Sequence, residues 1–390
     1  MKPSGRPRLA VITTSRADFG IYRPVLRELA QSEKLSLGLI VTGMHLSPAF
    51  GLTVKEVRDS GYEIWAEEPS LAEGDDASSI ATSCGATVQA VARCLAKCAP
   101  DLVMVLGDRF EMMGATLAAY TFRLPLLHLH GGEETTGSYD NGFRHAISKL
   151  SHMHFVATAL AARRLVQMGE APERVVQTGA PGLDALARST IPDKAKLLQR
   201  TGLRDAPYLL ITYHSETLGD LSAEQGVDQL WQAVAGSGLQ LLVTAANADT
   251  DGRKINRMLA ERCAQSVQCV FVESLGHELY SAAMRHAEAM VGNSSSGIIE
   301  AAQFELPVVN IGRRQEGRER SANVIDCAAD AESIRQALQR ACSAEFRRTL
   351  TDLVNVYGDG QAAPRIRQAI EAIEDPKTLL IKPFRLLDEC

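Results

Sequence analysis

The chain has 390 residues, of which 45% are hydrophobic and 23% are charged, and its formal net charge at pH 7 is −6. A chain of this length and composition is expected to form two globular domains, and its acidic balance excludes a basic surface for nucleic acid or an anionic membrane. No segment approaches the roughly 18 apolar residues of a membrane span. We therefore expect a cytoplasmic protein that contacts neither membrane nor nucleic acid.

Short apolar segments followed by helical periodicity recur along the first half of the chain. They occupy Leu9–Ile12, Leu37–Val41, Leu102–Leu106, Leu124–Leu129 and His154–Ala157. The same alternation resumes in the second half at Tyr208–Thr212, Gln240–Thr244, Cys269–Val272, Ala289–Val291 and Pro307–Ile311. Strands that alternate with helices indicate parallel sheets. The pattern predicts an α/β protein with two such sheets.

Glycine and proline residues between 179 and 205 indicate a linker near residue 185. We predict an N-terminal Rossmann-like domain over residues 1–185 and a C-terminal Rossmann-like domain over 186–365. A helix and tail over 366–390 follow, for which packing against the first domain is one arrangement. Ligands of open parallel sheets bind beyond the carboxyl ends of the strands, so we expect a shared cleft there.

Polar motifs of the first half follow the predicted strands. Arg16 begins a helix after the first strand, where free N–H groups suit a phosphate, although an ordinary capped turn would look the same. Asp108 and Arg109 follow the 102–106 strand, and both can face a ligand from the loop. A structural ion pair between these two residues is the alternative interpretation.

The next strand opens into Gly131-Gly132-Glu133, and Asp140 follows on the next helix. Two glycines let the backbone approach a ligand while the carboxylate projects from it. His128 and His130 share one strand face, which is also compatible with a metal site, but no further ligand completes the set. The eight cysteines are scattered without a C-x-x-C pair, so we expect reduced, mostly structural thiols and no bound metal.

The second half carries the stronger phosphate signal. The segment 292–297 follows a short strand and contains Ser294 and Ser295, whose hydroxyls suit a pyrophosphate. Glu300 can accept hydrogen bonds from ribose hydroxyls. His214 follows the 208–212 strand and can donate to a phosphate or protonate a leaving group. Arg314, in the segment 312–318, can close over the phosphates; an exposed basic loop is the alternative.

Seven segments, taken in order, resemble the hydrolysing UDP-N-acetylglucosamine 2-epimerases of sialic and legionaminic acid biosynthesis. They are residues 15–20, 42–51, 106–111, 130–133, 144–149, 292–297 and 312–318, and the likeness covers nearly the whole chain. The resemblance implies a GT-B-like fold of two Rossmann-like domains facing a cleft, with the nucleotide held chiefly by the C-terminal domain. It implies that UDP contacts Arg16, Arg109, His214, Asn247, Ser294, Ser295, Glu300 and Arg314.

The same resemblance assigns acid and base chemistry to Asp108, Glu133 and Asp140, with His214 as a further candidate. It implies conversion of UDP-N-acetylglucosamine and water to N-acetylmannosamine and UDP, by elimination to a glycal and hydration. Alternatives are a UDP-2,4-diacetamido-2,4,6-trideoxyhexose as substrate, a GT-B glycosyltransferase, or a nucleotide-sugar sensor without catalysis. We expect no cofactor, a UDP-sugar as the partner molecule, and a homo-oligomer, either dimer or tetramer.

Overall fold

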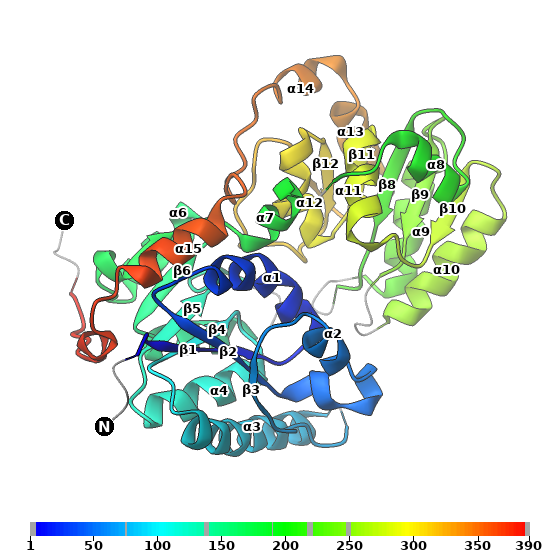
Figure 1. The fold of residues 1–390 in the computed structure, drawn as a ribbon. Coiled ribbons are helices and arrows are strands. Elements are labelled where there is room, and N and C mark those ends of the chain that lie inside the picture. Colours follow the sequence, from blue (N-terminus) through cyan, green and yellow to red (C-terminus); the bar gives the residue numbers. More distant parts are fainter. Residues whose placement is uncertain are drawn as a thin grey trace. The chain divides into compact units, whose positions relative to one another are not determined.

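The computed structural model describes residues 5–74, 76–135, 140–188, 190–216, 221–246 and 251–386. The chain forms two compact units (Figure 1). Unit 1 comprises Met1–Glu134, Ser138–Ala185 and Tyr357–Cys390, and unit 2 comprises Thr135–Gly137 and Leu186–Val356. Unit 1 therefore resumes at Tyr357, whereas the sequence placed a separate terminal segment from residue 366. Among the described residues, no helix combines the length and the apolar content that a bilayer span requires.

Unit 1 is built on a parallel sheet of seven strands in the order β3-β2-β1-β4-β5-β6-β7. The strands are β1 (Arg8–Thr13), β2 (Ser36–Val41), β3 (Ile64–Glu67), β4 (Leu102–Leu106), β5 (Leu126–Leu129), β6 (Met153–Val156) and β7 (Val175–Gln177). The long helices are α1 (Arg16–Ala30), α3 (Ala77–Cys98), α4 (Phe110–Thr121), α5 (Asp140–Leu150), α6 (Ala159–Gln167) and α15 (Ala362–Glu371). Shorter ones are α2 (Val54–Arg58), η1 (Gly43–Leu46), η2 (Pro48–Phe50), η3 (Pro172–Arg174) and η5 (Pro376–Leu380), and α7 (Pro181–Arg188) begins in unit 1 and ends in unit 2.

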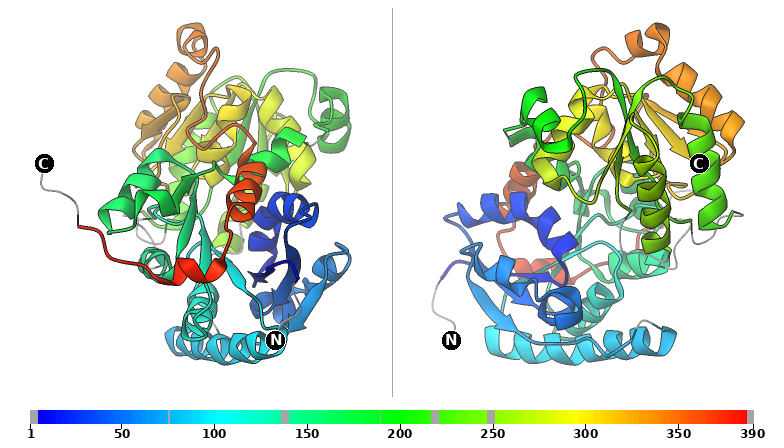
Figure 2. Two further views of the ribbon diagram at one scale, coloured as in Figure 1. Left: turned by 60° about the vertical axis from the view of Figure 1, so that its left-hand side comes forward. Right: turned by 90° about the vertical axis from the view of Figure 1, so that its right-hand side faces the viewer.

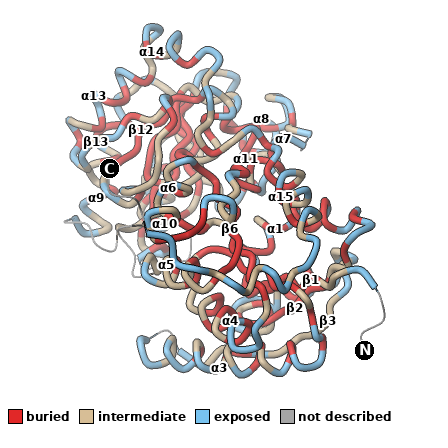
Figure 3. Tube along the Cα trace, turned by 90° about the vertical axis from the view of Figure 1, so that its left-hand side faces the viewer, coloured by how far each residue is buried: buried red, intermediate tan, exposed pale blue. Residues whose placement is uncertain are grey.

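Helices cover both faces of this sheet, with α3 and α4 on one face and α1 and α15 on the other (Figures 1 and 2). All five residues of β4 and all of β1 except Arg8 are buried because their side chains pack on both faces, which explains the apolar segments Leu9–Ile12 and Leu102–Leu106 (β1 is labelled in Figure 3). The edge strand β3 is only partly buried, and its sequence carries no comparable apolar signal.

Unit 2 holds a parallel sheet of six strands in the order β10-β9-β8-β11-β12-β13. The strands are β8 (Tyr208–Thr212), β9 (Gln240–Thr244), β10 (Cys269–Val272), β11 (Ala289–Gly292), β12 (Val308–Ile311) and β13 (Val324–Cys327). The helices are α8 (Lys194–Thr201), α9 (Ala223–Val234), α10 (Gly252–Ala264), α11 (Gly276–His286), α12 (Ser295–Ile299), α13 (Ala331–Ala341), α14 (Ala344–Arg348) and η4 (Ala301–Phe304). The predicted pair of parallel α/β domains is confirmed.

The C-terminal segment packs within unit 1. Ile366 and Ile370 of α15 enter the core beside α1, and the buried Asp184 carboxylate accepts hydrogen bonds from the first amides of α15. Further on, Lys382 Nζ lies 2.7 Å from a carboxylate oxygen of Glu170, which is 1% exposed. Lys149 and His154 also contact Glu170, so a buried negative charge is matched by several donors.

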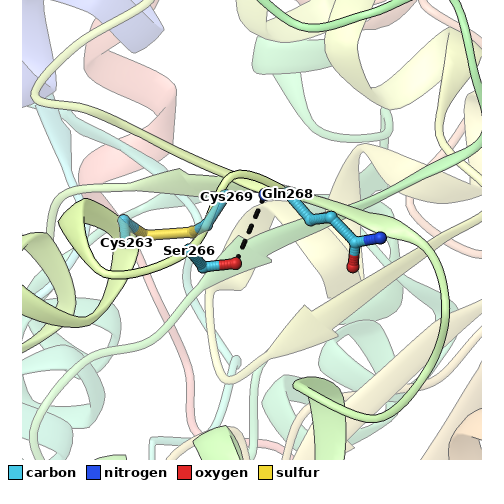
Figure 4. The surroundings of a disulfide bond; sticks show 4 residues. All are labelled: Cys263, Ser266, Gln268 and Cys269. Carbon is cyan, nitrogen blue, oxygen red and sulfur yellow. Dashed lines mark hydrogen bonds between the residues drawn. A yellow bond between two sulfur atoms is a disulfide. The ribbon is translucent and has the colours of Figure 1, made fainter.

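The prediction of reduced cysteines is wrong for one pair. A disulfide joins Cys263 at the end of α10 to Cys269 at the start of β10 (Figure 4). The two Cα atoms are 4.8 Å apart, within the ordinary range for a disulfide, because the chain turns directly from the helix into the strand. Gln268 N donates to Ser266 Oγ inside this turn at 3.3 Å.

Candidate active site

Each sheet changes the direction of its strand order between two central strands, β1 and β4 in unit 1, and β8 and β11 in unit 2. Loops that leave such neighbouring strands at their carboxyl ends diverge, which opens room for a ligand. The predicted motifs occupy these positions. Arg16 and Asp108 follow β1 and β4, while His214 and Ser294 follow β8 and β11.

Asp108 is held by an arginine that the sequence analysis did not single out as a site residue. Arg144 of α5, which is 5% exposed, forms an ion pair with the Asp108 carboxylate. Its Nη1 also donates to the carbonyl oxygen of His130 at 2.9 Å. One buried guanidinium therefore fixes the loop after β4 to the loop after β5. The predicted alternative, a pair between Asp108 and its neighbour Arg109, does not form.

Glu133 is oriented by His130. The His130 backbone is left-handed, with φ of 59°, and its Nδ1 lies 2.6 Å from Glu133 Oε1. The two glycines between them are required by packing. A Cβ on Gly131 would lie 2.8 Å from His128 Nδ1, and one on Gly132, at φ of 72°, would lie 2.4 Å from a backbone oxygen. The G-G-E motif therefore forms a tight turn that presents the carboxylate.

His128 is a core residue. Its Nε2 lies 2.9 Å from the Gly107 carbonyl oxygen and its Nδ1 lies 3.1 Å from Ser148 Oγ. Burial lowers the pKa of His128 to about 3, so the ring stays neutral. His130, in contrast, turns toward Glu133. In the part of the chain that the structure describes, no three His, Cys, Asp or Glu side chains are arranged to hold a metal.

Arg109 is largely engaged within unit 1. Its Nε and Nη2 each lie 3.2 Å from a carboxylate oxygen of Glu111, which is fully buried, and Nη2 lies 3.6 Å from Met44 Sδ. Burial alone would lower the pKa of Arg109, but Glu111, Asp18 and Asp140 raise it above the ordinary value. Asp140, the first residue of α5, is therefore close enough to Arg109 to act on its charge.

Arg16 lies at the start of α1 with 76% of its side chain exposed, and its Nε is 3.3 Å from Glu56. Asp18 organises the loop before it, which the sequence analysis missed. The buried Asp18 carboxylate accepts hydrogen bonds from Thr13 and from the backbone amides of Thr14 and Ser15. The bond from the Ser15 amide and the bond from the Asp18 amide to Ser15 Oγ form the capping box of α1, and all of these contacts fix the turn that presents Arg16.

Asn141, the residue after Asp140, contacts Glu134. Its Nδ2 donates to Glu134 Oε2 at 2.8 Å, and His145 Nε2 lies 2.9 Å from Glu134 Oε1. Burial by itself raises the pKa of Glu134, but these hydrogen bonds lower it below the ordinary range. A second fixed carboxylate therefore follows Glu133, and no pattern in the sequence distinguished it.

In unit 2, Asn293 joins the loops that follow β8 and β11. Its Oδ1 accepts from the His214 amide at 2.7 Å, and its Nδ2 donates to the His214 carbonyl at 2.9 Å. The preceding Gly292 has φ of 143°, and a Cβ there would lie 2.0 Å from the Thr212 carbonyl oxygen. This close approach brings the 292–297 loop against the end of β8. The same geometry buries His214, which is 4% exposed.

Ser294 caps α12, and Ser295 is its first helical residue. Glu300 ends this helix and is only partly covered, yet the surrounding protein raises its pKa to about 7. Within the described residues, its carboxylate has no hydrogen bond or ion pair. A carboxylate without protein donors is suited to accept hydrogen bonds from a ligand.

Arg314 and Gln315 both donate to the Asn293 carbonyl oxygen, at 3.1 Å and 2.9 Å. The loop after β12 is therefore tied to the loop after β11, which places the Arg314 guanidinium beside Ser294. Asn247, the remaining predicted contact, lies outside the described residues. For every residue named in the sequence analysis, the catalytic or binding role stays a prediction.

Comparison with known proteins decides the family. A family model described as UDP-N-acetylglucosamine 2-epimerase matches residues 27–371. The chain belongs to the UDP-N-acetylglucosamine 2-epimerase family. It is 37% identical over 367 residues to the UDP-N,N'-diacetylbacillosamine 2-epimerase (hydrolyzing) of Legionella pneumophila, covering 94% of this chain and 96% of that protein. It is 34% identical over 373 residues to the UDP-N-acetylglucosamine 2-epimerase of Neisseria meningitidis, covering 95% of this chain and 96% of that protein.

A solved structure supports the fold. The crystal structure of UDP-GlcNAc 2-epimerase from Neisseria meningitidis bound to UDP-GlcNAc superposes with a TM-score of 0.78 at 19% identity, covering 93% of this chain and 99% of that one. The resemblance to the hydrolysing 2-epimerases, the prediction of an enzyme of this type and the GT-B-like fold are confirmed.

Proposed function

We propose that the chain is a hydrolysing 2-epimerase of a UDP-2,4-diacetamido-2,4,6-trideoxyhexose of the diacetylbacillosamine type. The observation that supports the reaction class is that Arg144 ties the loop of Asp108 to the loop of His130 and Glu133 in unit 1, while unit 2 has a polar loop suited to phosphate. The sugar is chosen from the relatives, because the 37% identical protein is named for the diacetylated sugar. UDP-N-acetylglucosamine, the first prediction from the sequence, is the second candidate, because a 34% identical relative is named for it.

Unit 2 supplies the nucleotide site in this proposal. Ser294 and Arg314 bind the pyrophosphate, and Glu300 accepts hydrogen bonds from the ribose. The positive charge and the hydroxyl donors stabilise UDP as it leaves with the electrons of the C1–O bond. His214, beside Asn293, is a donor to the same group.

Unit 1 supplies the acid and base chemistry. One carboxylate removes the C2 proton while the C1–O bond to UDP breaks, which leaves a C1–C2 double bond. Water then adds its oxygen at C1, and a proton is delivered to C2 from the opposite face. Asp108 is the better candidate for the base, because its ion pair with Arg144 holds the carboxylate in place at the end of β4. Glu133 is then the candidate for the acid, and His130 Nδ1, 2.6 Å from its carboxylate, can exchange a proton with it.

Product analysis in D₂O tests the proposal. The purified protein is incubated separately with the two UDP-sugars and without any acceptor, and the released sugar is identified by NMR. We expect a free sugar with inverted configuration and deuterium at C2, formed faster from the diacetylated substrate. Faster turnover of UDP-N-acetylglucosamine would favour the second candidate. Release of a sugar that keeps its C2 hydrogen and configuration would contradict an epimerase, and turnover only with an added acceptor would indicate a glycosyltransferase.

A further inference from the structure

Five hydroxyl groups form a continuous chain in unit 2, behind the 292–297 loop. Ser294 Oγ lies 2.8 Å from Ser296 Oγ, which lies 2.9 Å from the Tyr280 hydroxyl of α11. The Tyr280 hydroxyl lies 3.0 Å from Thr212 Oγ1 at the end of β8, and Thr212 Oγ1 lies 2.6 Å from Thr244 Oγ1 at the end of β9. The chain therefore connects the predicted phosphate contact Ser294 to two neighbouring strand ends.

The inner end of this hydroxyl chain is defined by an acceptor. Thr244 Oγ1 lies 3.3 Å from the Ile211 carbonyl oxygen, which cannot donate. Each hydroxyl has one proton, so the hydroxyl chain has two arrangements that keep all four hydrogen bonds between the hydroxyls. In the inward arrangement every hydroxyl donates toward Thr244, which donates to the carbonyl. In the outward arrangement every hydroxyl donates toward Ser294, whose own proton is then available to a ligand.

The burial of the hydroxyl chain allows its hydroxyls to adopt either arrangement. Thr212 and Thr244 are 6% and 5% exposed, so little bulk water competes for their hydrogen bonds. Burial raises the pKa of Tyr280 above its ordinary value although its hydrogen bonds lower it, so the phenol keeps its proton at neutral pH. Hydrogen bonds in such chains polarise one another, which makes the direction a property of the whole chain.

We propose that the hydroxyl chain reverses from inward to outward when an anionic phosphate reaches Ser294, which makes Ser296, Tyr280 and Thr212 positioning residues for the nucleotide, while Thr244 favours the inward arrangement in the absence of the phosphate. The inference rests on the proposed function, since it takes UDP as the ligand at Ser294. An anion attracts the positive ends of hydroxyl dipoles, and the outward arrangement aligns all five toward it. A neutral ligand has no such effect.

Two substitutions should act in opposite directions. Tyr280→Phe interrupts the hydroxyl chain and keeps the ring, so only Ser296 remains to polarise Ser294. Thr244→Val removes the acceptor of the Thr212 hydroxyl in the inward arrangement, so the buried Thr212 proton would have no partner there. In the outward arrangement the same substitution removes only a donor to Thr212, which costs less free energy. Tyr280→Phe should weaken UDP, whereas Thr244→Val should leave UDP binding unchanged or make it tighter.

The test is calorimetric titration of the full chain with UDP and with uridine, which has no phosphate. We expect Tyr280→Phe to bind UDP about twofold to tenfold more weakly and uridine as the wild type does. Ser296→Ala interrupts the chain at a second point and should behave like Tyr280→Phe, which keeps the test available if one variant does not fold. Tyr208→Phe is the matched control, because the Tyr208 hydroxyl donates to the Ala283 carbonyl at 2.7 Å outside the chain.

Equal UDP affinity in Tyr280→Phe, Ser296→Ala and the wild type would overturn the inference, and so would an equal loss for UDP and uridine. Weakening of UDP by Thr244→Val to the same extent as by Tyr280→Phe would overturn the reversal. A wild-type protein that does not bind UDP would overturn the proposed function and the inference together, which distinguishes that failure from the others.

Discussion

Uridine binding should depend on pH because of Glu300. The ordinary pKa of a glutamate is 4.5 and burial raises that of Glu300 to about 7, so ionising it in the folded protein costs about 3 kcal/mol more than in water. If the carboxylate accepts the ribose hydroxyls, binding below pH 7 must release the proton. Affinity should then fall about tenfold for each pH unit below 7, and be about a hundredfold weaker at pH 5 than at pH 8.

The assay is calorimetric titration with uridine at pH 5, 6, 7 and 8, in buffers of different ionisation enthalpy. Uridine is used because the phosphates of UDP titrate in this range themselves. We expect release of about one proton per uridine at pH 5 and none at pH 8. Glu300→Gln should bind weakly and without this pH dependence. A wild-type affinity that is constant between pH 5 and 8, or an unchanged pH dependence in Glu300→Gln, would refute the assignment of the ribose to Glu300.

Three further predictions concern unit 1. Asp108→Asn and Glu133→Gln should each lower turnover at least about a hundredfold with unchanged UDP affinity by calorimetry; loss of UDP affinity would move both residues from catalysis to binding. Gly132→Ala should lower the free energy of unfolding in urea by about 2 kcal/mol or more, because the left-handed backbone and the nearby carbonyl oppose a Cβ, whereas Gly142→Ala, with open space around its Cβ, should not destabilise. Lys382→Met should lower the free energy of unfolding by about 2 kcal/mol at neutral pH. The hydrogen bonds that Glu170 accepts outweigh burial and lower its pKa to about 2, so the stability difference between Lys382→Met and the wild type should disappear as the pH falls from about 4.5 to 2. A stability difference that does not change with pH would contradict the ion pair.

The sequence predicted the central strands well because these strands are buried on both faces and read as unbroken apolar runs. It did not predict β3, β7 or β13, which are short strands at the edges of their sheets. These three edge strands have few buried positions and mixed residues, so they give no periodic signal, whereas the edge strand β10 was predicted because all four of its residues, Cys269–Val272, are apolar. The disulfide was missed for a different reason. Its spacing matches no familiar motif, and only the turn between α10 and β10 brings the sulfur atoms together.

Site residues that follow strands were identifiable because topology places the carboxyl ends of parallel strands together. The residues that orient them were not. Arg144 reaches Asp108 across 36 positions of the sequence, and no local pattern encodes that contact. Tyr280 reads as an ordinary helical residue, and its place between Ser296 and Thr212 depends on the packing of α11. Residues at strand ends can therefore be predicted from the sequence, whereas the residues that contact and orient them are identified only in the folded structure.

The return of the chain to unit 1 has a consequence for the order in which the nascent polypeptide can fold. Leu186–Val356 is one continuous segment, so unit 2 has almost all of its chain as soon as that segment leaves the ribosome. Unit 1 has to wait for α15 and for Lys382, and until they are synthesised Asp184 lacks the amides of α15 and Glu170 lacks one of its cations. Residues synthesised after unit 2 therefore complete the core of unit 1, and a ribosome that stops before α15 would leave unit 1 without part of that core.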